Sequence, residues 1–283
     1  MHPLARALHA RIADPVRVDA YYAPLAVACA ARLERATRRP WTVGIQGPQG
    51  GGKSTLAEAL VGAFNDVDVR AISVSIDDFY LTYAEQTAIA ERHADNPYLR
   101  YRGYPGTHDV PLGRAVIDAL RALTDGKETL VPAYDKSAHE GRGDRADPSR
   151  WRRVIGPLDV LVLEGWMLGF SPVPEDRLDA LEAGLRAPNA YLAAYSAWNE
   201  TLDTLVHLDV ESLDTIVKWR VDSERARRSR GEIALSDDDA RDYIKRCLPA
   251  YRAYVPRLQA SPPCADFERI VLADDRLPRD RPR

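Results

Sequence analysis

The glycine-rich segment Gly-Pro-Gln-Gly-Gly-Gly-Lys-Ser at residues 47–54 constrains the fold of this 283-residue chain more than any other feature. It matches the pattern G-x-x-x-x-G-K-[ST], with an apolar run at 41–46 before it and a good helical segment at 53–64 after it. In such a loop, glycines let backbone N–H groups turn inward around phosphate oxygens, the lysine adds a positive charge, and the serine offers a hydroxyl to Mg²⁺. The order strand, loop, helix therefore predicts a site for the phosphates of a nucleoside triphosphate. The residues that we expect to contact the nucleotide are Gly47, Gly50, Gly51, Gly52, Lys53, Ser54 and Thr55.

Short apolar runs alternate with helical segments along the rest of the chain. The apolar runs that we expect to form strands are 41–46, 69–75, 160–163, 205–210 and 270–273. The segments that we expect to form helices are 53–64, 82–92, 110–123, 213–230 and one that runs from Ser236 toward Leu258. Strands that alternate with helices favour a mostly parallel sheet with helices on both faces. The predicted fold class is therefore α/β.

The chain divides into three parts on this interpretation. Residues 4–38 have apolar positions at helical spacing and predict an N-terminal helical extension over 1–40 that ends before Pro40. The α/β domain covers 41–275, and long loops at 95–109 and 134–150 interrupt its alternation. Residues 276–283 are expected to form a loose C-terminal tail.

Composition and charge exclude several classes of protein. A content of 45% hydrophobic and 29% charged residues is typical of globular proteins. The chain has 42 acidic and 39 basic residues, so it lacks the excess of positive charge that is typical of a nucleic-acid binder. The three cysteines lie far apart without a C-x-x-C pair, which predicts neither a disulfide framework nor a zinc site and favours a reducing cytoplasm. Since no run of about 18 apolar residues occurs, we expect no membrane partner either. The oligomeric state stays open.

Carboxylates at the ends of two predicted strands narrow the chemistry. Glu164 follows the apolar run 160–163, so it is expected at the edge of the sheet, where it can hold a metal beside Ser54. Asp77 and Asp78 follow the strand after the glycine-rich loop, where one of them can accept a proton from an alcohol that attacks the γ-phosphate. The residues alone do not separate these two aspartates.

The chain resembles a known group of kinases in these and several longer motifs. The loop, the strand-end Asp-x-Phe-Tyr and the Glu-Gly strand resemble the group that contains uridine kinase, phosphoribulokinase and pantothenate kinase. A closer resemblance is to the plant and fungal D-glycerate 3-kinase family. The motifs that carry it are SIDDFYLT (75–82), YRG (101–103), THD (107–109), VPAYDKSA (131–138), GRGDRA (141–146), EGWMLGF (164–170) and LPAY (248–251).

The resemblance implies a P-loop NTPase fold with insertions for the acceptor and a helical lid. It implies an enzyme that transfers the γ-phosphoryl group of ATP, with Mg²⁺, to D-glycerate or a similar hydroxy acid and forms 3-phosphoglycerate. By analogy with the wider group it favours Asp77 over Asp78 as the base. Lys53 is then expected to stabilise the transferring phosphoryl group, while Ser54 and Glu164 hold the metal.

Polar residues in the two long loops are candidates for the acceptor site. A hydroxy acid needs a cation or hydrogen-bond donors for its carboxylate, and a guanidinium group is a natural partner. The candidates are Arg102, His108, Tyr134, Lys136 and Arg142, with Arg145 beside them.

An arginine-rich helix in residues 212–235 resembles the mobile lid of these kinases. Arginines of such a lid neutralise charge that develops on the phosphoryl group. Helical spacing puts Arg220, Glu224 and Arg228 on one face, so Glu224 could orient both arginines. Arg220 and Arg228 are the expected catalytic residues of the lid.

Two other functions stay open on the sequence. One is a P-loop kinase for another alcohol, such as uridine, another nucleoside or a pantothenate-like compound. The other is a nucleotide-gated regulatory ATPase. Against the latter, the chain has no Asn-Lys-x-Asp signal for guanine recognition, and Asp77 offers a base for an acceptor.

Overall fold

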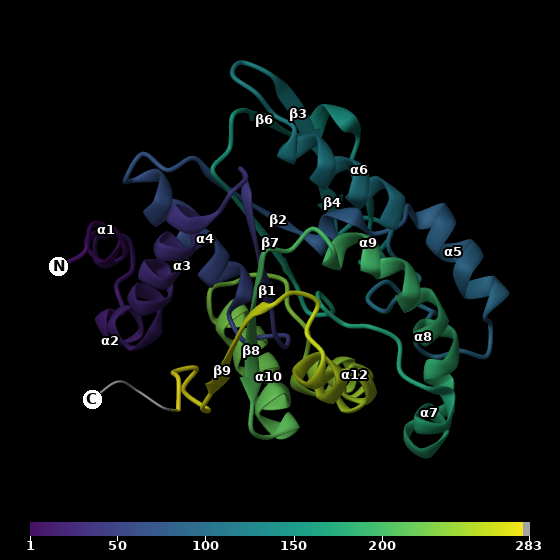
Figure 1. The fold of residues 1–283 in the computed structure, drawn as a ribbon. Helices are drawn as coiled ribbons and strands as arrows, with labels where there is room; N and C mark the ends of the chain where they lie inside the picture. The colour runs from purple at the N-terminus through teal and green to yellow at the C-terminus, as the bar shows by residue number, and fades with distance from the viewer. Residues whose placement is uncertain (280–283) are drawn as a thin grey trace.

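Five parallel strands form the central sheet of the structure, a computed structural model that describes residues 1–279 (Figure 1). Their order across the sheet is β2 (Ala71–Ser75), β7 (Val160–Gly165), β1 (Trp41–Gln46), β8 (Thr204–Val210) and β9 (Asp266–Leu272). Each apolar run predicted as a strand lies wholly or largely in one of them. The predicted α/β fold with a mostly parallel sheet is confirmed.

The register of the sheet brings three loops to one edge. Ser75 at the end of β2 lies opposite Glu164 of β7, and Gln46 at the end of β1 lies opposite Gly165 of β7 and His207 of β8. The glycine-rich loop after β1, the turn after β2 and the end of β7 are therefore neighbours, because parallel strands all end on the same side. This edge is where the sequence predicts the site.

The N-terminal helices cover one face of the sheet together with α4 (Lys53–Asn65). The extension is mostly helical as predicted, but residues 12–14 and 36–38 are not; its four pieces pack beside α4 at the purple end of the chain (Figure 1). Leu8, Tyr22 and Leu56 share a buried cluster with Trp41 and Val162 of the sheet. The pieces are α1 (Pro3–Arg11), α2 (Pro15–Arg17), the π-helical turn η1 (Val18–Tyr22) and α3 (Ala23–Arg35).

A second buried cluster covers the other face, under α6 (Val110–Arg121) and α12 (Leu248–Ala260). A chain of short helical pieces between β7 and β8 adds to it, and Trp198 donates from Nε1 to the carbonyl of Val110 at 3.1 Å. Sequence analysis did not predict these pieces, because each is too short to show a helical period. They are α7 (Glu175–Leu181), η4 (Ala183–Leu185), α8 (Arg186–Leu192), η5 (Ala193–Tyr195) and α9 (Ser196–Asn199).

The long insertions between β2 and β7 contain small elements of their own. Helix α5 (Tyr83–Arg92) begins as predicted, with a reciprocal capping box between Thr82 and Glu85. Two antiparallel strand pairs, which were not predicted from the sequence, form in the region that follows α6, and the short helical turn η3 (Pro148–Arg150) lies in the same region. Another short helical turn, η2 (Ile76–Phe79), directly follows β2. The pairs are β3 (Glu128–Val131) with β6 (Arg152–Ile155), and β4 (Tyr134–Asp135) with β5 (Asp144–Arg145).

The region after β8 differs from the prediction in one respect. Helix α10 (Leu213–Ser229) forms as predicted, but the single helix expected from Ser236 toward Leu258 is wrong, because α11 (Asp237–Lys245) ends before α12 begins. Pro249 lies in the first turn of α12, where its missing N–H costs nothing, whereas inside a continuous helix it would break the hydrogen-bond pattern.

The predicted loose tail begins at residue 276, but the chain is held by specific contacts as far as residue 279. Arg276 donates from Nε to the carbonyl of Gly50 at 2.8 Å, and the carbonyl of Asp274 accepts from Nε1 of Trp219 at 2.8 Å. These contacts tie the segment after β9 to the glycine-rich loop and to α10. The rest of the predicted tail, 280–283, lies outside the described residues. Within residues 1–279, none of the helices has the length and apolar character needed to cross a bilayer.

Candidate active site

The glycine-rich loop needs its glycines for two physical reasons. Gly50 and Gly52 have φ angles of +80° and +89°, a backbone conformation that side chains disfavour. At Gly47 a Cβ atom would lie 2.8 Å from Cβ of Leu208, and at Gly50 it would lie 3.0 Å from Cβ of Trp219. The loop is therefore folded tightly between β8 and α10, and α4 begins directly after it with Gly52 as its N-cap.

Lys53 and Ser54 are the residues that the motif predicts to contact the phosphates and the metal. Nζ of Lys53 donates to the carbonyl of Pro48 at 3.0 Å, so the ammonium lies over its own loop. Desolvation lowers the pKa of Lys53, against the raising effect of the carboxylates of Glu164 and Asp77. Both acids lie close enough to act on the charge of this ammonium.

Ser54 and Glu164 form a pair that fits a magnesium ion. Oγ of Ser54 donates to Oε1 of Glu164 at 3.0 Å, and Glu164 is buried at the end of β7. Two oxygen donors at this spacing suit a hard cation that keeps further sites for phosphate and water. Among the residues that the structure describes, there is no group of three or more His, Cys, Asp and Glu side chains able to hold a metal. An ion here would need oxygens from a nucleotide as well.

An open cavity of about 430 Å³ lies between the glycine-rich loop and α10, and Ser54 is one of the residues that line it. Helix α10 contributes Asp222, Ser223 and Ala226, and two arginines from distant parts of the chain complete the wall. The lining residues from the loop and α4 are Gly50, Gly52, Lys53, Ser54 and Thr55, and the two arginines are Arg17 and Arg276. All but two of the residues predicted to contact the nucleotide line this cavity; Gly47 and Gly51 shape the loop beneath it.

The structure gives Asp77 and Asp78 different surroundings, which the sequence alone could not. Oδ2 of Asp77 accepts from Nζ of Lys136 at 2.6 Å. Desolvation acts to raise the pKa of Asp77, but Lys136, with smaller effects from His108 and a hydrogen bond from Tyr80, outweighs it, and the pKa lies below its ordinary value. Asp78 is near Arg152 instead, and desolvation raises its pKa to about 6. Asp77 is thus the ionised carboxylate next to the other predicted acceptor residues.

His108 and Tyr134 lie close enough to Asp77 for its charge to act to raise the pKa of both side chains. The ring of His108 stacks on Tyr80 with 4.2 Å between ring centroids, and its Nδ1 lies 2.8 Å from the hydroxyl of Tyr195. Desolvation lowers the pKa of His108 to about 4, so the ring is neutral at pH 7. Nε2 of His108 and the hydroxyl of Tyr134 are buried atoms without a hydrogen-bond partner. Such atoms are costly unless a bound molecule satisfies them.

The arginines predicted to hold an acceptor carboxylate are engaged elsewhere. Nη1 of Arg102 donates to the carbonyls of Gly141, at 2.7 Å, and of Arg142, and its Nη2 donates to the carbonyl of Lys136 at 3.3 Å. The guanidinium of Arg142 lies over the rings of Tyr83 and Tyr101. Arg102 therefore fixes the loop after β4, and the structure does not bring Arg142 to Asp77.

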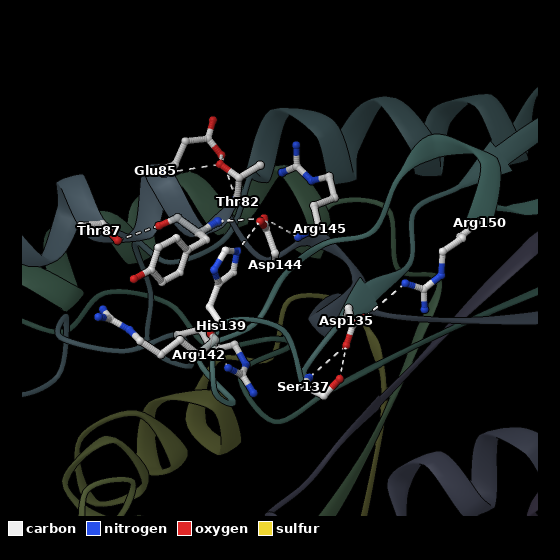
Figure 2. A network of polar contacts seen from close by, with 12 residues as sticks. Thr82, Glu85, Thr87, Asp135, Ser137, His139, Arg142, Asp144, Arg145 and Arg150 are labelled. Carbon is white, nitrogen blue, oxygen red and sulfur yellow. Dashed lines mark hydrogen bonds and ion pairs between the residues drawn. The ribbon is translucent and has the colours of Figure 1, made fainter.

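Figure 2 shows the polar network that fixes the loop between β4 and β5. Asp144 accepts from the backbone N–H of Tyr83 at 2.9 Å and lies 3.0 Å from Nε2 of His139. At the other end of the loop, Asp135 accepts from the hydroxyl of Ser137 at 2.6 Å and from Arg150 at 3.2 Å. The backbone on both sides of Lys136 is thereby held in place. Arg145 pairs with Asp109 at 2.9 Å and is part of this framework.

The predicted lid arginines differ in their partners. Nη2 of Arg220 lies 2.5 Å from Oε1 of Glu224, whose side chain is almost fully buried, and the guanidinium lies over the ring of Tyr243. The prediction that Glu224 orients both arginines is wrong for Arg228, which pairs with Asp237 at 2.5 Å at the start of α11. Helical spacing allowed both contacts, but the acidic first turn of α11, folded against α10, competes for Arg228.

Sequence reasoning missed two residues that support the glycine-rich loop. The hydroxyl of Tyr251, in α12, donates to Oε1 of Gln49 at 2.5 Å. Arg276 reaches the loop from beyond β9 and lies over the ring of Trp219. Tyr251 belongs to the LPAY motif, but the motif alone does not indicate that its tyrosine supports the loop. The segment around Arg276 carries no motif.

Comparisons with known proteins agree with this geometry. The family model described as "Phosphoribulokinase / Uridine kinase family" matches residues 42–173. The chain is 38% identical over 274 residues to "D-glycerate 3-kinase, chloroplastic" of Arabidopsis thaliana, which covers 93% of this chain and 60% of that protein. The chain thus spans less than two thirds of that relative's length.

Two further relatives match over most of their length. The chain is 35% identical to "Uncharacterized kinase mug58" of Schizosaccharomyces pombe, over 85% of this chain and 90% of the relative. The solved structure of "D-glycerate 3-kinase from Cryptococcus neoformans var. grubii" superposes with a TM-score of 0.82 at 27% identity, over 91% of this chain and 97% of that one. The likeness therefore extends over the insertions and the lid as well as the sheet.

Proposed function

Since the chain belongs to the phosphoribulokinase and uridine kinase family, we propose that it transfers the γ-phosphoryl group of ATP to a hydroxyl of D-glycerate, giving 3-phosphoglycerate and ADP. One observation carries the chemistry of this proposal. The glycine-rich loop, the pair of Ser54 with Glu164, and the ionised Asp77 meet at the carboxyl ends of three adjacent strands. The choice of D-glycerate rests on the two relatives that carry this name.

The nucleotide binds with its phosphates on the glycine-rich loop in this proposal. Backbone N–H groups of residues 50–54 surround the phosphate oxygens, and Lys53 moves its ammonium from the Pro48 carbonyl to the outer phosphates. Ser54 and Glu164 would hold Mg²⁺, which would neutralise negative charge on the phosphates. The cavity between the loop and α10 leaves room for the rest of the nucleotide.

Asp77 receives the proton of the acceptor hydroxyl. As that proton moves to the carboxylate, the hydroxyl oxygen forms a bond to the γ-phosphorus, and the bond from this phosphorus to the bridging oxygen of ADP breaks. Lys53 and Arg220 stabilise the negative charge on the phosphoryl oxygens, and Arg220 is held ready for this by Glu224. The proton then leaves Asp77 for solvent, which restores the carboxylate.

The acceptor is a small hydroxy acid because of the groups around Asp77. Lys136 offers a cation for its carboxylate, and the unpartnered atoms of His108 and Tyr134 offer hydrogen bonds to its hydroxyls. A neutral histidine donates or accepts a hydrogen bond without adding charge, so in this proposal the positive charge that meets the carboxylate comes from Lys136.

A panel of acceptors tests the proposal directly. Purified protein with ATP and Mg²⁺ is offered D-glycerate, L-glycerate, uridine and pantothenate in a coupled assay of ADP release. We expect the highest kcat/KM with D-glycerate and no ADP release after chelation of divalent metal with excess EDTA. High turnover of uridine or pantothenate with none of D-glycerate would overturn the substrate. ADP release that ignores every acceptor but rises with a protein partner would instead support a regulatory ATPase.

A further inference from the structure

The cations around the proposed base differ in their partners. Arg102 donates to three backbone carbonyls of the loop after β4. Nη2 of Arg145 contacts Asp109 and the carbonyl of Tyr80, although its buried Nε has no partner. Lys53 lies over the phosphate loop. Lys136 alone among these four pairs with Asp77 itself, at 2.6 Å from Nζ to Oδ2.

Lys136 is also the cation that can move at little cost. Its side chain is 58% exposed, whereas that of Asp77 is 27% exposed. The backbone around it is fixed, since Asp135 accepts from both the N–H and the hydroxyl of Ser137 (Figure 2). Arg102 also donates to the carbonyl of Lys136. A flexible four-carbon side chain on a fixed backbone can change its partner without refolding the loop.

The contact between Lys136 and Asp77 opposes the proposed reaction. A carboxylate oxygen that accepts a charge-assisted hydrogen bond from an ammonium is a weaker acceptor for the proton of an alcohol. While the ammonium stays there, Oδ2 does not accept the proton of the acceptor hydroxyl, and the same positive charge makes Oδ1 a weaker base. An acceptor that brings its own carboxylate offers Lys136 a new partner of equal charge, and a neutral alcohol offers none.

We propose that Lys136 selects acceptors by their charge: its ammonium covers Asp77 in the free enzyme and transfers to the carboxylate of the hydroxy acid when that acceptor binds. This inference rests on the proposed function, in which Asp77 is the base. It makes uncovering of the base depend on an anionic acceptor. The same contact protects ATP, because water that enters the site without a carboxylate meets a covered Asp77.

Exchange of Lys136 for a neutral side chain removes both roles of this residue, and a charged and a neutral acceptor report on them separately. Lys136→Met removes the partner of the carboxylate and uncovers Asp77 at the same time. We expect kcat/KM for D-glycerate to fall by about 10- to 100-fold, the usual effect of losing one charge-assisted hydrogen bond. We expect kcat/KM for glycerol, which replaces the carboxylate by a neutral CH₂OH group, to stay the same or rise, so the preference for glycerate over glycerol falls at least tenfold.

Hydrolysis of ATP by water gives a readout that does not need a phosphorylated acceptor. D-lactate has the carboxylate and the 2-hydroxyl of D-glycerate but no 3-hydroxyl. We expect it to raise ATP hydrolysis by the unaltered protein several-fold, whereas neutral propane-1,2-diol has no effect. In Lys136→Met the basal hydrolysis is already raised and D-lactate adds nothing, and the double variant Asp77→Asn/Lys136→Met loses the increase.

Control variants and the pattern of outcomes distinguish this inference from the proposed function. Lys245→Met removes another exposed lysine paired with one aspartate, and it should leave acceptor preference and hydrolysis unchanged. Lys136→Gln repeats the test with a polar side chain, and melting temperatures report folding. If D-glycerate is phosphorylated but Lys136→Met keeps the wild-type preference or the wild-type basal hydrolysis, the inference is wrong and the proposed function remains. If D-glycerate is not phosphorylated, the hydrolysis experiment alone decides the role of Lys136: a raised, Asp77-dependent rate supports it and an unchanged rate overturns it.

Discussion

The buried carboxylate of Glu224 offers a prediction that separates a positioned lid arginine from a merely structural ion pair. Glu224 is 1% exposed and makes contacts with Arg220 at 2.5 Å and with the N–H of Leu235 at 3.0 Å. Glu224→Ala removes the partner of Arg220 and the acceptor of that N–H. Breaking a fully buried pair costs about 3–5 kcal/mol, and because the side chain of Arg220 is 25% exposed, water replaces part of the loss. We expect the free energy of unfolding to fall by about 2–3 kcal/mol.

The effect on catalysis follows from the freedom that Arg220 gains. Arginines that neutralise a transferring phosphoryl group contribute roughly 10³- to 10⁵-fold to kcat. Glu224→Ala leaves Arg220 in place but unoriented, so we expect kcat to fall about 10- to 100-fold, and Arg220→Met to lower it further. Arg228→Met, whose arginine pairs with Asp237, should change kcat by less than about threefold.

Urea unfolding and steady-state kinetics with D-glycerate check both effects. Leu8→Ala provides a matched control, because it removes a fully buried side chain of α1, far along the chain from the lid, at a cost of about 2–5 kcal/mol. It should lower stability and leave kcat unchanged below its melting temperature. The reasoning would be refuted if Glu224→Ala lost stability like Leu8→Ala while keeping the wild-type kcat, or if Arg228→Met were as damaging as Arg220→Met.

Three further predictions follow from the site and the sheet. Asp77→Asn should lower kcat by about two or more powers of ten with the Kd of ATP nearly unchanged, which calorimetry and turnover check together; similar kcat values would remove Asp77 as the base. Gly165→Ala places a Cβ 2.3 Å from Cδ1 of buried Ile76, next to the base, and should cost about 1–3 kcal/mol of stability by thermal unfolding; an unchanged melting temperature would contradict this crowding. Asp209 is desolvated, which acts to raise its pKa, but hydrogen bonds and charges from His207 and Arg269 lower the pKa from 3.8 to about 2. Its contribution of about 2 kcal/mol should therefore be complete above pH 4 and be lost as pH falls through 2, and urea unfolding of Asp209→Asn should show a correspondingly weaker acid dependence.

Local patterns in the sequence were sufficient for the sheet and the phosphate loop. Apolar runs of four to seven residues, the glycines before Lys53 and the capping box at Thr82 act through neighbours along the chain, so each is visible in a short window. The strand-end position of Glu164 followed from the same reasoning, because parallel strands end at one edge.

The partners of charged side chains could not be predicted in the same way. Arg102 and Lys136 both belong to motifs, yet one fixes a loop through backbone carbonyls and the other covers Asp77, 59 residues away in the sequence. Arg228 pairs with Asp237 of another helix, a contact that helical spacing within α10 does not reveal. Contacts of this kind depend on how separate elements fold together, and the roles proposed for these residues in catalysis stay predictions until the variants are measured.

Phosphorus NMR of the reaction mixture tests the central claim most directly. Wild-type protein with ATP, Mg²⁺ and D-glycerate is followed by the loss of the γ-phosphate signal and the appearance of new phosphorus signals. We predict that a phosphate monoester with the shift and proton coupling of 3-phosphoglycerate grows in equal amount to the γ-phosphate lost. Loss of the γ-phosphate as orthophosphate alone, or no loss in a folded protein that binds the nucleotide, would contradict the account.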